Sequence, residues 1–162
     1  MVAPFSKIFN IHNCKTLIKS KRSQKEDTVK VAILGSRTYE NKQKIREMIF
    51  LLKQKFPKLE IVSGGAGQGA DKYAKKFALE MNVGYLEFNP ACSNKNLYSA
   101  MPDEYYGHNF HVSQLFHRNE LMAMYADQII AFRSAGESKG TDHAIKMATK
   151  YGKQYIIIGD KV

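Results

Sequence analysis

Short apolar runs alternate with longer amphipathic segments along the chain from residue 29 onwards. The short runs are residues 29–34, 59–62, 83–88, 128–132 and 154–158. Continuous apolar runs of this length are typical of strands buried on both faces of a parallel sheet. No two runs are joined by a hairpin-length turn, so helices must connect them. The pattern therefore predicts an α/β fold, a Rossmann-like three-layer sandwich with a five-stranded parallel sheet.

Helical periodicity fills the intervals between these runs. Apolar residues recur at helical spacing within residues 45–56 and 70–81, and Pro57 stops the first of these helices. We expect two further helices near residues 118–125 and 141–151.

Two segments depart from the alternation. Residues 1–28 show no clean period, and we interpret them as a basic N-terminal extension ahead of one domain over residues 29–162. An amphipathic targeting peptide is the alternative for this extension. Residues 89–116 are an aromatic-rich insertion with Tyr98, Tyr105, Tyr106, Phe110 and Phe116. We interpret the insertion either as a lid or binding loop, or as a surface loop that packs its own aromatic side chains.

The chain is basic, with 25 Lys and Arg residues against 15 Asp and Glu, a net charge of +10. This excess suits an anionic partner such as a nucleic acid, a nucleotide or an acidic surface. No apolar run reaches the roughly 18–20 residues that span a bilayer, and no secretory signal is evident near the N-terminus. We therefore expect a cytoplasmic protein with no membrane partner. Cys14 and Cys92 lack metal-ligand spacing, and we expect reduced thiols.

Glycine and hydroxyl residues follow three of the predicted strands, in residues 35–37, 63–71 and 136–142. Ligands of open parallel sheets bind beyond the carboxyl ends of the strands. Glycine lets the backbone approach an anion closely, and the helix that follows supplies amide donors with a partial positive charge. We expect the last two loops to hold one phosphate group between them, with Arg37 or Lys139 adding charge-assisted hydrogen bonds.

The spacing Gly65-x-Gly67-x-x-Ala70 also fits a dinucleotide-binding fingerprint, with Glu87 about 20 residues on as a ribose-binding acid. A nicotinamide or flavin site is therefore an alternative. Against it, the loop follows the second strand rather than the first, and Asp71 would meet the pyrophosphate with a negative charge. A Walker A loop is excluded because no Gly-Lys-Ser/Thr follows the glycines. We expect no bound cofactor.

Arg118, Asn119 and Glu120 lie at the start of the helix expected before the fourth strand. The arginine could clamp a phosphate, and Glu120 could orient a sugar hydroxyl or a water. The alternative is that these residues form a solvent-exposed helix start, where the helix dipole favours a glutamate. Residues 108–117 hold three histidines, but no HExxH motif and no paired carboxylate accompany them, so we expect no metal site.

Five motifs in order, in residues 31–37, 64–71, 117–120, 126–127 and 139–141, resemble the YspA-like group of the SLOG superfamily. The resemblance covers about residues 29–159. It implies a Rossmann-like fold, a ligand pocket under the glycine loops and a homo-oligomer. Relatives similar to the cytokinin-activating LOG enzymes cleave the base from a nucleoside monophosphate, and relatives similar to DprA bind single-stranded DNA. Others are thought to sense nucleotide signals derived from NAD in conflicts between bacteria and phages.

The LOG-type enzymes carry a second loop that reads PGGxGTxxE, with a catalytic glutamate. Gly140 and Thr141 match this motif, but Ala144 stands at the position of the glutamate. Arg118 matches the functional arginine of the family, and Asn119 replaces the lysine beside it. The resemblance thus implies that the phosphate-binding residues are retained and that the usual catalytic carboxylate is lost.

Three functions remain as hypotheses. The first is binding of a nucleotide or nucleotide-derived phosphate ligand, as a sensor or scavenger of a signal nucleotide. Its expected ligand-binding residues are Gly35, Ser36, Arg37, Gly64, Gly65, Ala66, Gly69, Ala70, Arg118, Asn119, Gly140 and Thr141. The second is hydrolysis of the N-glycosidic bond of a nucleotide, a phosphoribohydrolase activity, with Asp71, Glu120 or Asp142 as the catalytic carboxylate. The third is single-stranded nucleic-acid binding through the basic extension and exposed tyrosines.

Overall fold

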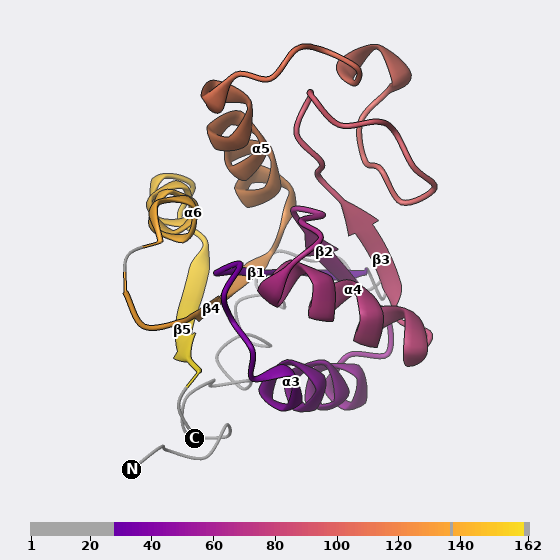
Figure 1. The fold of residues 1–162 in the computed structure, drawn as a ribbon. Coiled ribbons are helices and arrows are strands. Elements are labelled where there is room, and N and C mark those ends of the chain that lie inside the picture. Colours follow the sequence, from indigo (N-terminus) through magenta and orange to yellow (C-terminus); the bar gives the residue numbers. More distant parts are fainter. Residues whose placement is uncertain (1–27, 137, 161–162) are drawn as a thin grey trace.

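Five parallel strands form one sheet in the computed structural model, which describes residues 28–136 and 138–160 (Figure 1). The strands are β1 (Val29–Gly35), β2 (Leu59–Ser63), β3 (Gly84–Glu87), β4 (Gln128–Arg133) and β5 (Gln154–Gly159). Their order is β3-β2-β1-β4-β5, and each neighbouring pair is parallel. The expected α/β Rossmann-like fold with a five-stranded parallel sheet is confirmed. The expected N-terminal extension lies outside the described residues except for Thr28.

Helices cover both faces of the sheet. On one face lie α3 (Lys42–Lys55) and α4 (Gly69–Glu80), and on the other lie α5 (Val112–Tyr125) and α6 (Lys139–Lys150) (Figure 1). Side chains of β1 alternate between the two layers, because successive residues of a strand point to opposite faces. Val31 and Ile33 are buried in one cluster with Ile45 of α3, whereas Ala32 and Leu34 are buried in the other.

The helix before β4 begins earlier than the sequence predicted, because His111 caps it. The His111 Nδ1 accepts a hydrogen bond from the amide of Ser113 at 3.1 Å, and the Gln114 side chain accepts one from the amide of His111 at 3.1 Å. Histidine is not among the residues usually preferred at this position, so the signal was missed. Arg118 and Phe116 therefore lie inside α5 rather than at its start or in the insertion.

The insertion between β3 and α5 contains one short 3-10 helix, η1 (Asp103–Tyr105). Two of its aromatic side chains pack on each other, with ring centroids 5.2 Å apart for Tyr105 and Tyr106. Tyr98 packs against Tyr85 of β3 with ring centroids 5.5 Å apart, whereas Phe110 is 67% exposed. Both interpretations of the insertion, as a lid or binding loop and as a packed surface loop, stay predictions.

The order of the strands reverses direction at β1. The chain leaves β1 towards β2 on one side, and β4 lies on the other side. Ligands of open α/β sheets bind at such a reversal of strand order, beyond the carboxyl ends of the strands. Among the described residues, no helix has the length and apolar character needed to cross a membrane.

Candidate functional site

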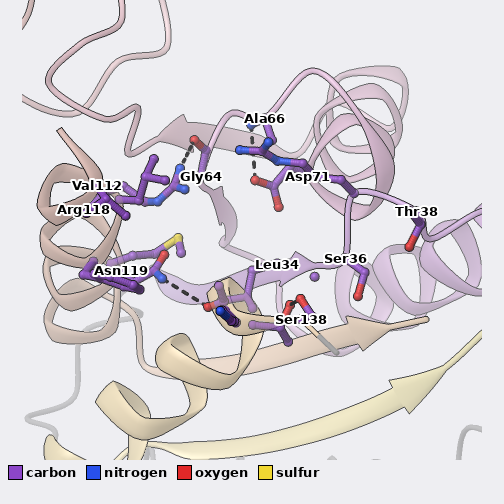
Figure 2. A pocket seen from close by; sticks show the side chains of 18 residues that line it. Leu34, Ser36, Thr38, Gly64, Ala66, Asp71, Val112, Arg118, Asn119 and Ser138 are labelled. Atoms are coloured by element: carbon purple, nitrogen blue, oxygen red, sulfur yellow. Dashed lines mark hydrogen bonds between the residues drawn. The ribbon is translucent and has the colours of Figure 1, made fainter. Parts of the chain in front are cut away.

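A cavity of about 460 Å³ lies at the carboxyl end of β1 (Figure 2). Its walls come from the loop after β1, the loop after β2, the inner face of α5 and the first turn of α6. This volume is within the range of small-molecule sites. The two glycine-rich segments that sequence analysis placed at one edge of the sheet thus line a common space.

The first turn of α6 presents polar groups to this cavity. Ser138, Lys139, Gly140 and Thr141 all line it. Ser138 is the N-cap residue, yet no side chain caps the helix, because the Ser138 hydroxyl donates instead to the Thr141 Oγ1 at 2.7 Å. The first amides of a helix have no partner within the helix, and together they carry a partial positive charge. This end of the cavity is therefore suited to an anion.

Arg118 holds the loop after β2 against α5. Its Nη1 donates to the carbonyl oxygen of Gly64 at 2.6 Å and to that of Phe88 at 3.5 Å, while its Nε is buried without a partner. Burial lowers the pKa of the Arg118 guanidinium, and the negative charge of Asp71 opposes this effect. A side chain at position 64 would place its Cβ 2.5 Å from the Arg118 Nη1, so the guanidinium or the loop would have to shift.

Asp71 is the one carboxylate among the described residues that line the cavity. Its side chain lies in the first turn of α4, and the residue is only 7% exposed. The Oδ2 accepts a hydrogen bond from the amide of Ala66 at 3.2 Å, whereas the buried Oδ1 has no partner. Burial raises the pKa of Asp71 to about 6, although the charge of Arg118 and the Ala66 amide act in the opposite direction. This carboxyl group therefore titrates close to neutral pH.

The inner face of α5 gives the cavity an apolar wall. The apolar lining residues of this helix are Val112, Leu115, Phe116 and Met122. Asn119 lies on the same face and donates from its side chain to the carbonyl oxygen of Gly140 at 3.2 Å, which joins α5 to the first turn of α6. Sequence analysis missed this wall, although the spacing of these residues matches one face of a helix.

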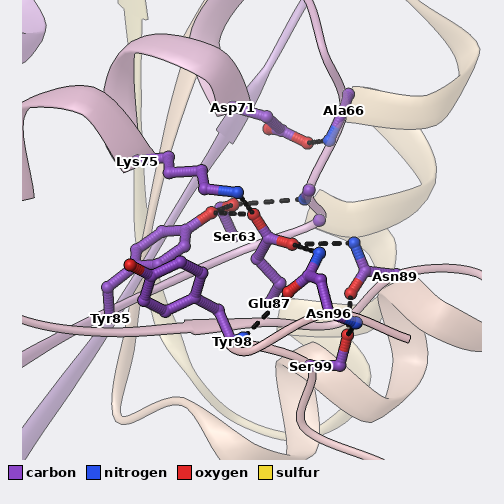
Figure 3. A network of polar contacts seen from close by, with 12 residues as sticks. Ser63, Ala66, Asp71, Lys75, Tyr85, Glu87, Asn89, Asn96, Tyr98 and Ser99 are labelled. Carbon is purple, nitrogen blue, oxygen red and sulfur yellow. Dashed lines mark hydrogen bonds and ion pairs between the residues drawn. The ribbon is translucent and has the colours of Figure 1, made fainter. Parts of the chain in front are cut away.

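Glu87 lies outside the cavity, in a buried polar network (Figure 3). Its Oε1 lies 2.9 Å from the ammonium of Lys75 and accepts from the Tyr85 hydroxyl at 3.0 Å. Its Oε2 accepts from the side chains of Asn89 at 2.9 Å and Asn96 at 2.8 Å. Burial alone would raise the pKa of Glu87, but these hydrogen bonds lower it below its usual value. The carboxylate has no free position for a ribose, as the dinucleotide alternative would require.

Three of the glycine-loop residues expected to bind phosphate do not line the cavity, namely Gly65, Gly69 and Ala70. The loop after β1 covers the start of α4, and the amide of Ala70 donates to the Ser36 carbonyl oxygen at 3.3 Å. A Cβ at Gly69 would lie 2.2 Å from that same oxygen. Protein backbone thus occupies the place at the start of α4 where we expected the anion.

The other two candidate carboxylates also lie outside the cavity lining. Glu120 accepts hydrogen bonds from the Tyr151 hydroxyl and from Lys150. Asp142 forms an ion pair with Arg133 at 3.1 Å. Ala144, at the position of the LOG glutamate, is buried in the core between α6 and the sheet. Among the described residues, no group of three or more His, Cys, Asp or Glu side chains is placed to hold a metal ion.

Comparisons with known proteins agree with this fold. The family model described as "YspA, cpYpsA-related SLOG family" matches residues 29–94. The molybdenum cofactor binding protein from the phototrophic bacterium Rippkaea orientalis is a structural neighbour, with a TM-score of 0.61 and 17% identity over 85% of this chain and 80% of that one. DNA processing protein A from Helicobacter pylori, described for its single-stranded DNA binding mode, has a TM-score of 0.60 and 23% identity over 80% of this chain and 64% of its own. No curated protein sequence matches the chain.

Proposed function

We propose that the cavity binds a nucleotide or a nucleotide-derived phosphate ligand. Over residues 29–94 the chain belongs to the YspA, cpYpsA-related SLOG family. One observation carries the proposal: the uncapped first turn of α6 lines the same cavity as the apolar face of α5. A nucleotide combines a phosphate with a flat, largely apolar base, so it matches both walls.

The phosphate belongs at the first turn of α6. The amides of Gly140 and Thr141 can donate to phosphate oxygens there, and Lys139 adds a positive charge at the same end. Arg37 and Ser36, from the loop after β1, line the adjoining wall. Arg37 is exposed and can fold over a bound anion.

The base belongs against α5, near the cavity mouth. Phe116 is 37% exposed and Val112 is 51% exposed, although both line the cavity. Apolar side chains left open beside a polar site are typical of ligand-binding surfaces. A base packed there would cover both side chains.

Isothermal titration calorimetry with AMP, GMP, CMP, ADP-ribose and NAD tests this proposal. We expect at least one of these nucleotides to bind with micromolar affinity, and we expect Thr141→Ala to weaken that binding. The proposal is wrong if none of them binds below millimolar concentration.

A hydrolase acting on the N-glycosidic bond is the second candidate, and Asp71 is the observation in its favour. An oxocarbenium-like transition state is stabilised by a nearby carboxylate, which can also activate a water. Among the described residues that line the cavity, Asp71 is the one carboxylate, and its pKa of about 6 suits proton transfer near neutral pH. Release of free base from AMP, GMP, CMP or NAD, lost in Asp71→Asn and retained in Glu120→Gln, would support this activity. If none of these four nucleotides releases free base, the protein does not hydrolyse their N-glycosidic bonds.

Single-stranded nucleic-acid binding has weaker support. The neighbour from Helicobacter pylori is described for such binding, and the chain has a net charge of +10. However, the tyrosines expected as stacking surfaces are packed against other rings, and Tyr106 is only 8% exposed. An affinity for single-stranded DNA that falls steeply with salt would favour this function over the nucleotide site.

A further inference from the structure

The Oδ1 of Asp71 is a buried acceptor without a hydrogen-bond partner. Most buried polar atoms in folded proteins have a partner, because an unpaired one loses its hydration without compensation. Asp71 lies beside Gly64 and Ala66 in the wall of the cavity (Figure 2). A group of the bound ligand is therefore the natural partner of this oxygen.

None of the neighbouring donors among the described residues bonds to this oxygen. The Ala66 amide bonds to the Oδ2 of the same carboxyl group, and the Arg118 Nη1 bonds to the Gly64 carbonyl oxygen. Lys75, one turn further along α4, pairs with Glu87. Among the described residues, no ion pair joins Asp71 to a cation. Since no described residue donates to this oxygen, a donor of the ligand can complete it.

The charge of Asp71 determines which part of the ligand it faces. A phosphate beside an ionised carboxylate is disfavoured by like-charge repulsion. The strand order places β1 between β2 and β4, so Asp71 and the first turn of α6 lie on opposite sides of the cavity. The ligand must then direct its phosphate to α6 and a neutral donor group to Asp71.

Resting on the proposed function, we propose that Asp71 accepts a hydrogen bond from a sugar hydroxyl of the nucleotide, so that the site selects ribonucleotides over deoxyribonucleotides. A nucleotide has two kinds of neutral donor, the sugar hydroxyls and the amino groups of the base. The base belongs at the exposed apolar residues Val112 and Phe116, whereas Asp71 is only 7% exposed. The sugar, which lies between phosphate and base, is the part that faces Asp71.

The test compares the ribonucleotide that binds most tightly among AMP, GMP and CMP with its 2′-deoxy and 3′-deoxy forms, by calorimetry on the unmodified protein. Loss of a hydrogen bond to a buried charged acceptor should weaken at least one deoxy form by on the order of 10- to 100-fold. A form lacking the exocyclic amino group of the base should bind within about threefold of the parent, because its sugar is intact. Equal affinities of ribo and deoxy forms would overturn the inference, and so would a loss confined to the amine-free form.

Variants then assign the effect to Asp71. Asp71→Asn replaces the charged acceptor with a neutral amide and should lower the ratio of ribo to deoxy affinity several-fold. Asp142→Asn should leave the ratio unchanged, because Asp142 pairs with Arg133 outside the cavity lining. An unchanged ratio in Asp71→Asn would assign the selection to another residue and overturn the inference. If no nucleotide binds at all, the proposed function itself fails, and this result is distinct from binding without sugar discrimination.

Discussion

Arg118 of α5 and Gly64 of the loop after β2 are 54 positions apart in sequence, yet the guanidinium donates to the glycine carbonyl oxygen at 2.6 Å. The Oδ2 of Asp71 lies near the same point, because a Cβ at position 64 would be 2.9 Å from it. The absence of a side chain at Gly64 thus leaves room for a cation and a carboxylate to lie close together in one cavity wall.

The first prediction concerns Gly64→Ala. The added Cβ would lie 2.5 Å from the Arg118 Nη1, so the guanidinium or the loop must shift. Overpacking of this kind costs about 1–3 kcal/mol, and we expect nucleotide affinity to fall at least about tenfold. Gly67→Ala is the matched control in the same loop, because nothing lies within 4 Å of its Cβ position. Calorimetry and thermal unfolding of both variants measure the difference. Equal affinities for the two would show that the geometry around Gly64 is unimportant for binding.

The centre of the sheet was predictable because β1, β2 and β4 are buried along most of their length and have continuous apolar runs, whereas β5 is largely exposed. The run of residues 128–132, for example, corresponds to β4, whose Ile129, Ile130, Ala131 and Phe132 are all buried. The start of α5 was not predictable from residue type, because it depends on the His111 ring accepting a local amide.

The location of the site was also predictable, but the orientation of each side chain was not. Asp71 is the third residue of α4 and Asp142 the fourth residue of α6, so both lie in first turns. Successive residues of a helix are rotated by about 100°, and one position changes the direction of a side chain. Asp71 therefore faces the cavity, as Thr141 does in α6, whereas Asp142 faces Arg133. Sequence analysis gave both carboxylates the same candidate role because it lacked the helix boundaries.

The second prediction tests the phosphate end with Lys139→Glu. Lys139 lines the cavity at the first turn of α6, and reversal of its charge places a carboxylate where the phosphate should bind. We expect affinity for the tightest-binding ribonucleotide to fall on the order of tenfold or more. Lys146→Glu makes the same change at an exposed position of the same helix, outside the cavity lining. Its affinity should stay within about threefold of the parent. An equal loss in both variants would indicate a general charge effect and argue against a phosphate at α6.

The third prediction follows from the raised pKa of Asp71. The pKa is about 6 in the folded protein against an ordinary value of 3.8 for aspartate, so the folded state binds this proton more tightly than the unfolded state. The stabilisation is fully present below about pH 4 and is lost as the pH rises through 6. Asp71→Asn removes the pH dependence of stability that comes from this carboxyl group, and its side chain keeps an oxygen that can accept from the Ala66 amide. Its stability relative to the parent should increase by about 3 kcal/mol between pH 4 and pH 8.

Urea unfolding of both proteins at several pH values measures this difference. Arg118, Arg37 and Glu87, whose charges act on Asp71, are present in both proteins, so their own titration largely cancels in the difference. Asp142→Asn, whose carboxylate side chain is 50% exposed, should show a change below about 1 kcal/mol over the same range. A relative stability of Asp71→Asn that is flat with pH would mean that the Asp71 carboxyl is not desolvated.

The last prediction concerns the buried network around Glu87. Hydrogen bonds from Lys75, Asn96, Asn89 and Tyr85 lower the pKa of Glu87 despite its burial, so the ionised form stabilises the folded protein. This stabilisation is present above pH 4.5, the ordinary pKa of glutamate, and is lost as the pH falls through the lower pKa of the folded state. Glu87→Gln retains the shape of the side chain but removes the charge and places an amide donor against the donors of Lys75 or the asparagines. We expect unfolding at pH 7 to become easier by on the order of 2 kcal/mol, with a smaller difference at pH 3.

Asp103→Asn is the matched control for Glu87→Gln, because Asp103 pairs with Lys95 while its side chain is 84% exposed. Exposed ion pairs contribute about 0–1 kcal/mol, so this variant should unfold close to the parent at both pH values. A Cβ added at Gly65 would lie 3.2 Å from the Oε2 of Glu87 and 2.2 Å from the side-chain nitrogen of Asn89, so the network packs close to the glycine loop. Urea denaturation of the two variants at pH 7 and pH 3 measures how much the buried and the exposed carboxylate each contribute to the free energy of unfolding. Equal stabilities at pH 7 would mean that the buried network does not hold the loop after β2 in place.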